Sequence, residues 1–172
     1  MKKNKNISLL KAYSFNPVTS LRWERLEKKL GFKVPNDYKA FIDQHGGKVW
    51  GDVESGEEVS ILSPFSRTPH LSLLDLGVSL LEGYKLSFVE DLKRIPFDYS
   101  LKPGGLLPWL LTSSGDIAFL FLGNESVNGT SIIFQMSRAA RYEIYLDLSC
   151  GEFSYRIATR TLQSGILPPL EK

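Results

Sequence analysis

Cysteine and histidine are scarce in this 172-residue sequence. Cys150 is the single cysteine, and His45 and His70 are the two histidines. One cysteine cannot form a disulfide within the chain, which excludes a disulfide-stabilised fold. Three such side chains without a short pair spacing do not make a zinc site of the Cys/His type, so we predict no metal ion.

Catalytic signatures are missing as well. The sequence has no Walker-type glycine-rich loop, no dinucleotide fingerprint and no Gly-x-Ser-x-Gly elbow. Cys150 lies in a predicted helix cap without a nucleophile motif. His45 ends a predicted helix, where we expect partial burial and where the helix dipole favours a positively charged ring. We therefore predict a protein that is not an enzyme, with no catalytic residue and no cofactor. A pocket holding His45 or His70 beside a strongly perturbed acid would instead indicate an enzyme acting on a small substrate.

Long hydrophobic runs are absent. The richest apolar stretch, residues 105–122, is interrupted by Pro108 and by the polar residues 113–116. A membrane-spanning helix needs about 20 mainly apolar residues. Residues 1–16 are positively charged but lack the pattern of a signal peptide, and we interpret them as a basic tail. The sequence thus predicts a cytoplasmic protein with no membrane segment.

The sequence has enough apolar side chains to fold. It is 42% hydrophobic and 23% charged, and it contains 3 Trp, 7 Tyr and 10 Phe. Such a chain is too apolar to be intrinsically disordered. Its length matches one hydrophobic core, so we predict a single domain over residues 17–172.

Apolar residues at three- and four-residue spacing predict helices in the first half of the chain. The first helix is capped by Ser20 and ends before Gly31, and the second follows Pro35 and ends at residues 46–47. A third helix is predicted over about residues 80–94. Short strands are expected at 49–50 and 59–62, on either side of the acidic run 52–58.

The second half predicts an antiparallel meander. Four apolar runs, at 106–112, 117–122, 131–136 and 141–148, are separated by turn residues. Residues 117–122 are apolar on both faces, which places them in the middle of the sheet. In the last run, alternation predicts a buried face made of Tyr142, Ile144, Leu146 and Leu148. A capping box over residues 149–152 opens a final helix that extends to about residue 162 before Gly165. The expected fold class is α+β, a mainly antiparallel sheet packed against N-terminal helices and a C-terminal helix.

Charge is balanced overall but unevenly distributed. The first 51 residues hold eleven basic and four acidic side chains, a formal charge of +7, and since the whole chain is +2 the remainder carries −5. Glu24 and Glu27 interrupt the basic face of the first helix, so we expect no nucleic-acid binding. Residues 52–58 alone carry −4. They are interpreted as a solvated acidic loop or as a charged recognition loop.

One segment resembles the SUKH superfamily, the Smi/Knr-like group. The matching positions, in order, are Leu30-Gly31, Val34-Pro35, Asp37-Tyr38, Phe41-Ile42 and Gly46-Gly47, followed later by Ser114-Gly115-Asp116 ahead of an apolar strand. The resemblance implies an α+β domain with a mixed or antiparallel sheet. It also implies that these residues carry structure more than chemistry. Many bacterial members are immunity proteins that protect the producing cell by binding a toxin domain, whereas fungal relatives are signalling scaffolds.

The resemblance and the absent chemistry together predict a protein-binding domain, most simply an immunity protein that neutralises a toxin. Toxin nucleases usually present a basic substrate face, which an acidic surface would complement. The candidate contact residues are Trp50, Asp52, Glu54, Glu57 and Glu58. Trp50 fits an aromatic anchor and equally a core position. The alternative is a regulatory or scaffold domain that binds a cellular protein unrelated to a toxin.

Overall fold

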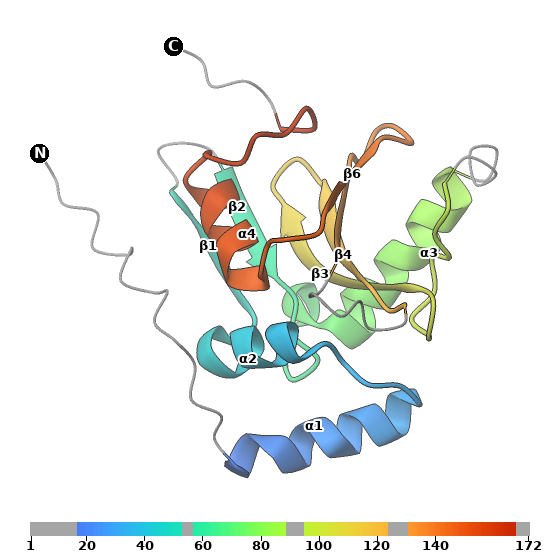
Figure 1. The fold of residues 1–172 in the computed structure, drawn as a ribbon, viewed down its shortest axis with the longest axis vertical. Coiled ribbons are helices and arrows are strands. Elements are labelled where there is room, and N and C mark those ends of the chain that lie inside the picture. The colour runs from blue at the N-terminus through green and yellow to red at the C-terminus, as the bar shows by residue number, and fades with distance from the viewer. Residues whose placement is uncertain (1–16, 53–56, 89–94, 124–130, 168–172) are drawn as a thin grey trace, which may run out of the picture.

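The sheet has six strands that lie side by side in the order in which they occur in the chain. The structure is a computed structural model that describes residues 17–52, 57–88, 95–123 and 131–167. Within these residues the strands are β1 (Lys48–Asp52), β2 (Glu57–Ile61), β3 (Leu106–Thr112), β4 (Ile117–Phe121), β5 (Ile132–Gln135) and β6 (Tyr142–Tyr145). Each strand pairs antiparallel with the next, so β1 and β6 form the two edges (Figure 1).

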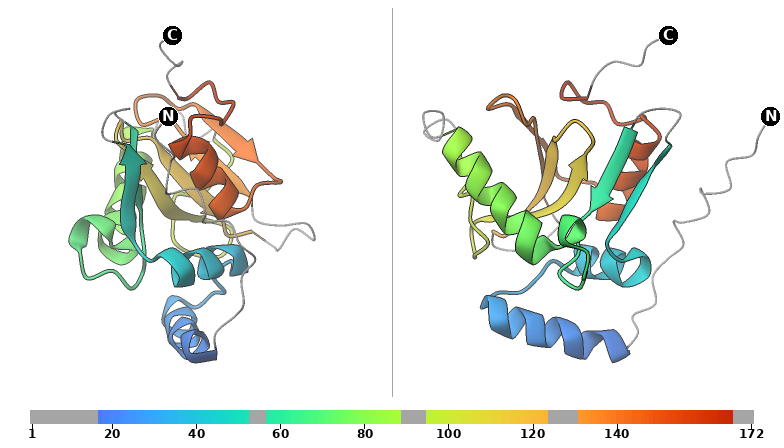
Figure 2. Two further views of the ribbon diagram at one scale, coloured as in Figure 1. Left: turned by 90° about the vertical axis from the view of Figure 1, so that its left-hand side faces the viewer. Right: turned by 180° about the vertical axis from the view of Figure 1, so that it is seen from behind.

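Helices lie on both faces of the sheet. In the described residues the α-helices are α1 (Pro17–Leu30), α2 (Asn36–His45), α3 (Val78–Ser87) and α4 (Cys150–Ala158). Helices α2 and α4 lie on one face and α3 on the other, while α1 lies beyond α2, away from the sheet (Figures 1 and 2). None of the helices in this part of the chain is long and apolar enough to cross a membrane.

The buried side chains form one cluster on each face. The larger cluster includes Trp23, Phe41, Trp109 and Phe153 and fills the space between the sheet and α1, α2 and α4. The smaller cluster lies under α3 and includes Tyr84, Tyr99 and Phe119. The predicted α+β fold with an antiparallel sheet is confirmed. The four apolar runs of the second half are the strands β3 to β6, and β4 is one of the two central strands, as predicted.

The predicted buried face of the last strand is wrong for two residues. Ile144 is 48% exposed and Leu146 is 61% exposed. Tyr145, predicted to face water, packs its ring against Phe153 of α4 with the centroids 5.3 Å apart. Helix α4 thus covers the face of β6 that carries Tyr145, and Ile144 lies on the opposite face.

Two helix ends also differ from the predictions. Helix α1 begins at Pro17, so Ser20 is not its N-cap. Helix α4 opens at the predicted Ser149 cap, whose Oγ accepts from the Glu152 N–H at 3.1 Å, but it ends at Ala158. It ends there because Arg160 adopts a positive φ of 54° and the chain turns back on itself.

The third helix is displaced from its predicted range. It covers Val78–Ser87 and follows a π-helical turn over Leu73–Gly77. The signal for this turn is the capping pattern of Ser72 and Asp75, since the Ser72 Oγ accepts from the Asp75 N–H at 3.2 Å. The predicted end of this helix, residues 89–94, lies outside the described residues.

Candidate protein-interaction site

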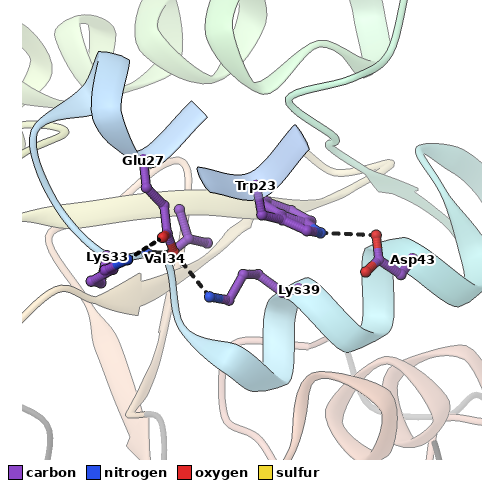
Figure 3. A network of polar contacts seen from close by, with 6 residues as sticks. All are labelled: Trp23, Glu27, Lys33, Val34, Lys39 and Asp43. Atoms are coloured by element: carbon purple, nitrogen blue, oxygen red, sulfur yellow. Dashed lines mark hydrogen bonds and ion pairs between the residues drawn. The ribbon is translucent and has the colours of Figure 1, made fainter. Parts of the chain in front are cut away.

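A buried carboxylate joins α1 to α2. Glu27 is 5% exposed and accepts hydrogen bonds from the Nζ atoms of Lys33 and Lys39, both at 2.9 Å, and from the Val34 N–H at 3.0 Å (Figure 3). Burial raises the pKa of this carboxyl, but the three donors outweigh burial and hold the pKa below its ordinary value. Glu27 therefore does not interrupt an exposed basic face, because its side chain lies in the contact between the two helices.

A second contact fixes the orientation of α1. The Trp23 Nε1 donates to Asp43 Oδ1 at 2.9 Å, and Arg22 donates to the same oxygen at 2.8 Å (Figure 3 shows the Trp23 bond). The Trp23 ring packs edge-on against the rings of Phe65 and Tyr38, with the ring centroids 4.7 Å and 6.1 Å apart, respectively. Helices α1 and α2 thus form one unit beside the sheet.

The residues of the sequence motif lie where the chain turns or enters the core. Gly31 follows α1 with a φ of +79° and Gly46 follows α2 with a φ of +67°, a region that favours glycine. The Tyr38 hydroxyl donates to the Leu62 carbonyl at 2.7 Å. Val34, Tyr38 and Phe41 are buried, while Leu30 and Pro35 are half-buried. The Tyr38 hydrogen bond thus ties α2 to the residue that follows β2.

Asp37 connects α2 to α4 across the chain. Its Oδ2 accepts from the Cys150 N–H at 2.6 Å, at the start of α4. A carboxylate at a helix N-terminus satisfies a backbone donor and complements the helix dipole. The contact spans 113 residues of sequence, so no local pattern could have revealed it.

Gly47 permits the close approach that begins β1. A Cβ on this residue would lie 2.9 Å from the Ser63 Cβ and 3.3 Å from the Ile61 carbonyl oxygen. A side chain would therefore push β1 away from β2, and glycine keeps the edge strand in register.

Trp50 is held in place on the surface of the sheet. Trp50 is half-buried, and its ring packs edge-on against the rings of Phe41 and His45, with the ring centroids 5.4 Å and 5.1 Å apart, respectively. The Lys48 ammonium lies 4.9 Å from the ring centroid, close enough for a cation–π contact. Trp50 is thus partly core and partly accessible.

The prediction of a favoured positive charge on His45 is wrong in sign. Burial, followed by the positive charge of Lys48, lowers the pKa of His45 below its ordinary value. With its pKa lowered, the ring against Trp50 is neutral at neutral pH.

The acidic candidates gather at the far end of β1 and β2. Asp52 and Glu57 are register partners, and Glu58 is paired with Gly51. Glu58 is exposed, whereas the side chains of Asp52 and Glu57 and the whole of Glu54 lie outside the described residues. The fold thus brings Asp52, Glu57 and Glu58 to one end of β1 and β2. Glu58 lies on the opposite face of the sheet from Trp50, because it adjoins Val59, the register partner of Trp50.

The second motif segment lies at the β3–β4 turn. Gly115 has a φ of +88°. Asp116 is buried and accepts from the Ser114 hydroxyl at 2.9 Å and from the Ser137 N–H at 2.8 Å. The turn therefore fastens the β3–β4 connection to the β5–β6 connection. It also lies beside β2, since the Ser113 N–H donates to the Glu58 carbonyl at 2.9 Å.

The titratable side chains show no catalytic arrangement in the described part of the chain. Cys150 is fully buried, and burial together with the neighbouring Asp37 raises the pKa of its thiol well above the ordinary value. No cluster of three or more His, Cys, Asp or Glu residues suited to a metal ion occurs there. What the arrangement offers is a rigid edge of the sheet with an ordered aromatic residue and acidic residues.

The fold and this surface define an α+β domain suited to protein binding. A family model described as SMI1 / KNR4 (SUKH-1) matches residues 17–153, so the chain belongs to that family. Members of this family typically bind protein partners. Searches of curated proteins and of solved structures returned no match.

Proposed function

We propose that this protein is a non-enzymatic immunity protein of the cytoplasm, which neutralises a cognate toxin by binding it. Membership of the SMI1 / KNR4 (SUKH-1) family is the observation that carries the proposal, because this family includes toxin immunity proteins. The edge formed by β1 and β2 supports a docking surface, since the half-buried Trp50 lies on one face of this edge and the exposed Glu58 on the other.

Neutralisation follows from occlusion of the active site or substrate surface of the toxin. An acidic surface attracts the basic face with which a nuclease holds its substrate, and it accelerates association at low salt. Trp50 is already ordered by Phe41 and His45. Such a preordered side chain loses little conformational entropy when it is buried by a partner.

Expression of the toxin domain in cells with and without this chain tests the proposal. We expect the toxin alone to stop growth, and co-expression to restore it and to give a complex on a sizing column. A toxin with a different immunity protein serves as the control and should still kill. Survival of cells that lack this chain, or separate elution of the two proteins, would contradict the proposal.

The alternative is a regulatory or scaffold domain that binds another cellular protein. Genomic neighbourhood separates the two, since an immunity gene is expected directly downstream of a large secreted toxin gene. A chain that lacks this neighbour and binds a cellular protein would favour the scaffold.

A further inference from the structure

The outer edge of β1 carries unpaired backbone groups whose positions follow from the register. The Glu58 carbonyl accepts from the Ser113 N–H at 2.9 Å, so Glu58 bonds towards β3. Alternate residues of a strand bond to opposite sides, and Val59, the register partner of Trp50, therefore bonds towards β1. It follows that Val49 and Gly51 direct their N–H and C=O groups away from the sheet.

This edge lacks two of the features that usually block strand addition, namely proline and a bulge. Strand β1 contains no proline, and its register with β2 runs without a bulge from Lys48 to Asp52. Val49 is a strand-forming residue and is 44% exposed. No described residue pairs with the outer side of β1.

The opposite edge, β6, is flanked by the chain's own C-terminal segment. Glu143 on β6 accepts from the Ser164 hydroxyl at 2.6 Å and from the Gly165 N–H at 2.8 Å. Ile166, the next residue, is 3% exposed and belongs to the larger core cluster. Of the two edges, β1 is therefore the one open to another chain.

The row of residues that crosses β1 at Gly51 indicates the chemistry of the incoming strand. Gly51 is paired with the exposed Glu58 and has no side chain to cover it. A residue of an added strand opposite Gly51 would lie two strand spacings, about 10 Å, from Glu58. An extended lysine or arginine side chain spans that gap.

We propose that the outer edge of β1 binds the partner by strand addition. An extended segment of the toxin domain pairs with the outward groups of Val49 and Gly51, and its lysine or arginine crosses Gly51 to meet Glu58. This inference rests on the proposed function and names the surface through which that function acts.

Proline substitution at the two edges tests the proposal. Val49→Pro removes an outward N–H and blocks strand approach, but leaves the hydrogen bonds between β1 and β2 intact. Ile144→Pro is the matched control. The Ser131 carbonyl accepts from the Phe121 N–H, so Ser131 bonds towards β4. The next residue, Ile132, therefore bonds towards β6, where its register partner is Tyr145. Ile144 adjoins Tyr145, so its N–H faces outwards. Ile144 is also comparably exposed, at 48%.

The probe is the toxin domain encoded immediately upstream of this gene. Calorimetry measures its affinity for the wild-type chain and for each variant, and urea unfolding midpoints confirm that both variants fold. Val49→Pro is expected to weaken binding about tenfold or more, and Ile144→Pro to leave it unchanged. Amide exchange in the wild-type chain provides a test that needs no variant. The amides of Val49 and Gly51 should exchange rapidly in the free protein and slowly in the complex.

Each outcome bears on one claim. If the wild-type chain forms no complex, the proposed function and the strand addition both fail. If Val49→Pro binds as tightly as the wild type, or the Val49 and Gly51 amides stay unprotected in the complex, strand addition is overturned while the function stands. If the chain alone forms a dimer that Val49→Pro dissociates, the occupant of the edge is a second copy and not the toxin.

Discussion

Replacing Glu27 by glutamine tests how α1 is held on α2. The change keeps the size of the side chain and an acceptor for the Val34 N–H, but removes the charge that faces Lys39, whose side chain is 12% exposed. Lys33 is 78% exposed and contributes little. Breaking a fully buried pair costs roughly 3–5 kcal/mol. Because Lys39 still reaches water in part, we expect the free energy of unfolding to fall by about 2–3 kcal/mol.

Urea unfolding followed by circular dichroism measures this loss, which corresponds to a fall in Tm of about 4–12 °C. Glu24→Gln is the matched control, since Glu24 lies on the same helix, carries the same charge and is exposed. We expect it to change stability by less than about 0.5 kcal/mol. Equal effects of the two substitutions would refute the role assigned to the buried carboxylate.

The pH dependence of the Glu27 contribution follows from the direction of its pKa shift. Since the pKa of Glu27 is lowered in the folded state, its contribution is complete above the unfolded-state pKa and is lost as the pH falls through the folded-state pKa. The stability difference between the wild type and Glu27→Gln should be constant down to about pH 5 and shrink below it. A difference that does not change in acid would contradict this cause.

Three further predictions test other parts of the structure. Asp37→Ala removes the acceptor for the Cys150 N–H at the start of α4, and we expect a loss of about 1–2 kcal/mol in urea unfolding. The buried Cys150 thiol, whose pKa is raised by burial, should react with a disulfide reagent at once in denaturant but only slowly in buffer. Reversing the charges of Glu57 and Glu58 should slow association with the toxin domain in stopped-flow measurements and flatten its salt dependence.

Each of these three has its own contrary result. Asn36→Ala changes an exposed neighbour of Asp37, so an equal loss in both variants would argue against the capping contact. Rapid labelling of the native thiol would contradict the burial of Cys150. Glu82→Lys controls for a charge reversal elsewhere on the surface, since Glu82 is exposed on α3. An unchanged association rate for the Glu57/Glu58 variant would remove the acidic residues from the docking surface.

The elements of the fold were predictable where they depend on local pattern. The four apolar runs between residues 106 and 148 became β3 to β6, because turn residues separate them and leave no room for helical crossovers. The glycines at 31 and 46 end α1 and α2 with positive φ. In contrast, α4 ends early because Arg160 takes the positive φ that glycine usually supplies, so its sequence gave no stop signal.

The parts that the sequence did not predict depend on contacts between distant residues. Glu27 is one of several charged residues on α1, and only the positions of Val34 and Lys39 make it a buried acceptor. The exposure of Ile144 follows from its place on the face of β6 opposite Tyr145, which packs against α4. Similarly, the positions of Trp50 and Glu58 in sequence suggested a docking surface, but only the register of β1 with β2 showed which backbone groups face outwards.

A titration of toxin activity against this chain tests the central claim most directly. Purified toxin domain at fixed concentration is mixed with increasing amounts of the full chain, and its residual activity is measured. Neutralisation by tight binding predicts a linear fall to zero at one equivalent. Full toxin activity in the presence of excess chain would contradict the claim that this protein acts by binding and occluding a toxin.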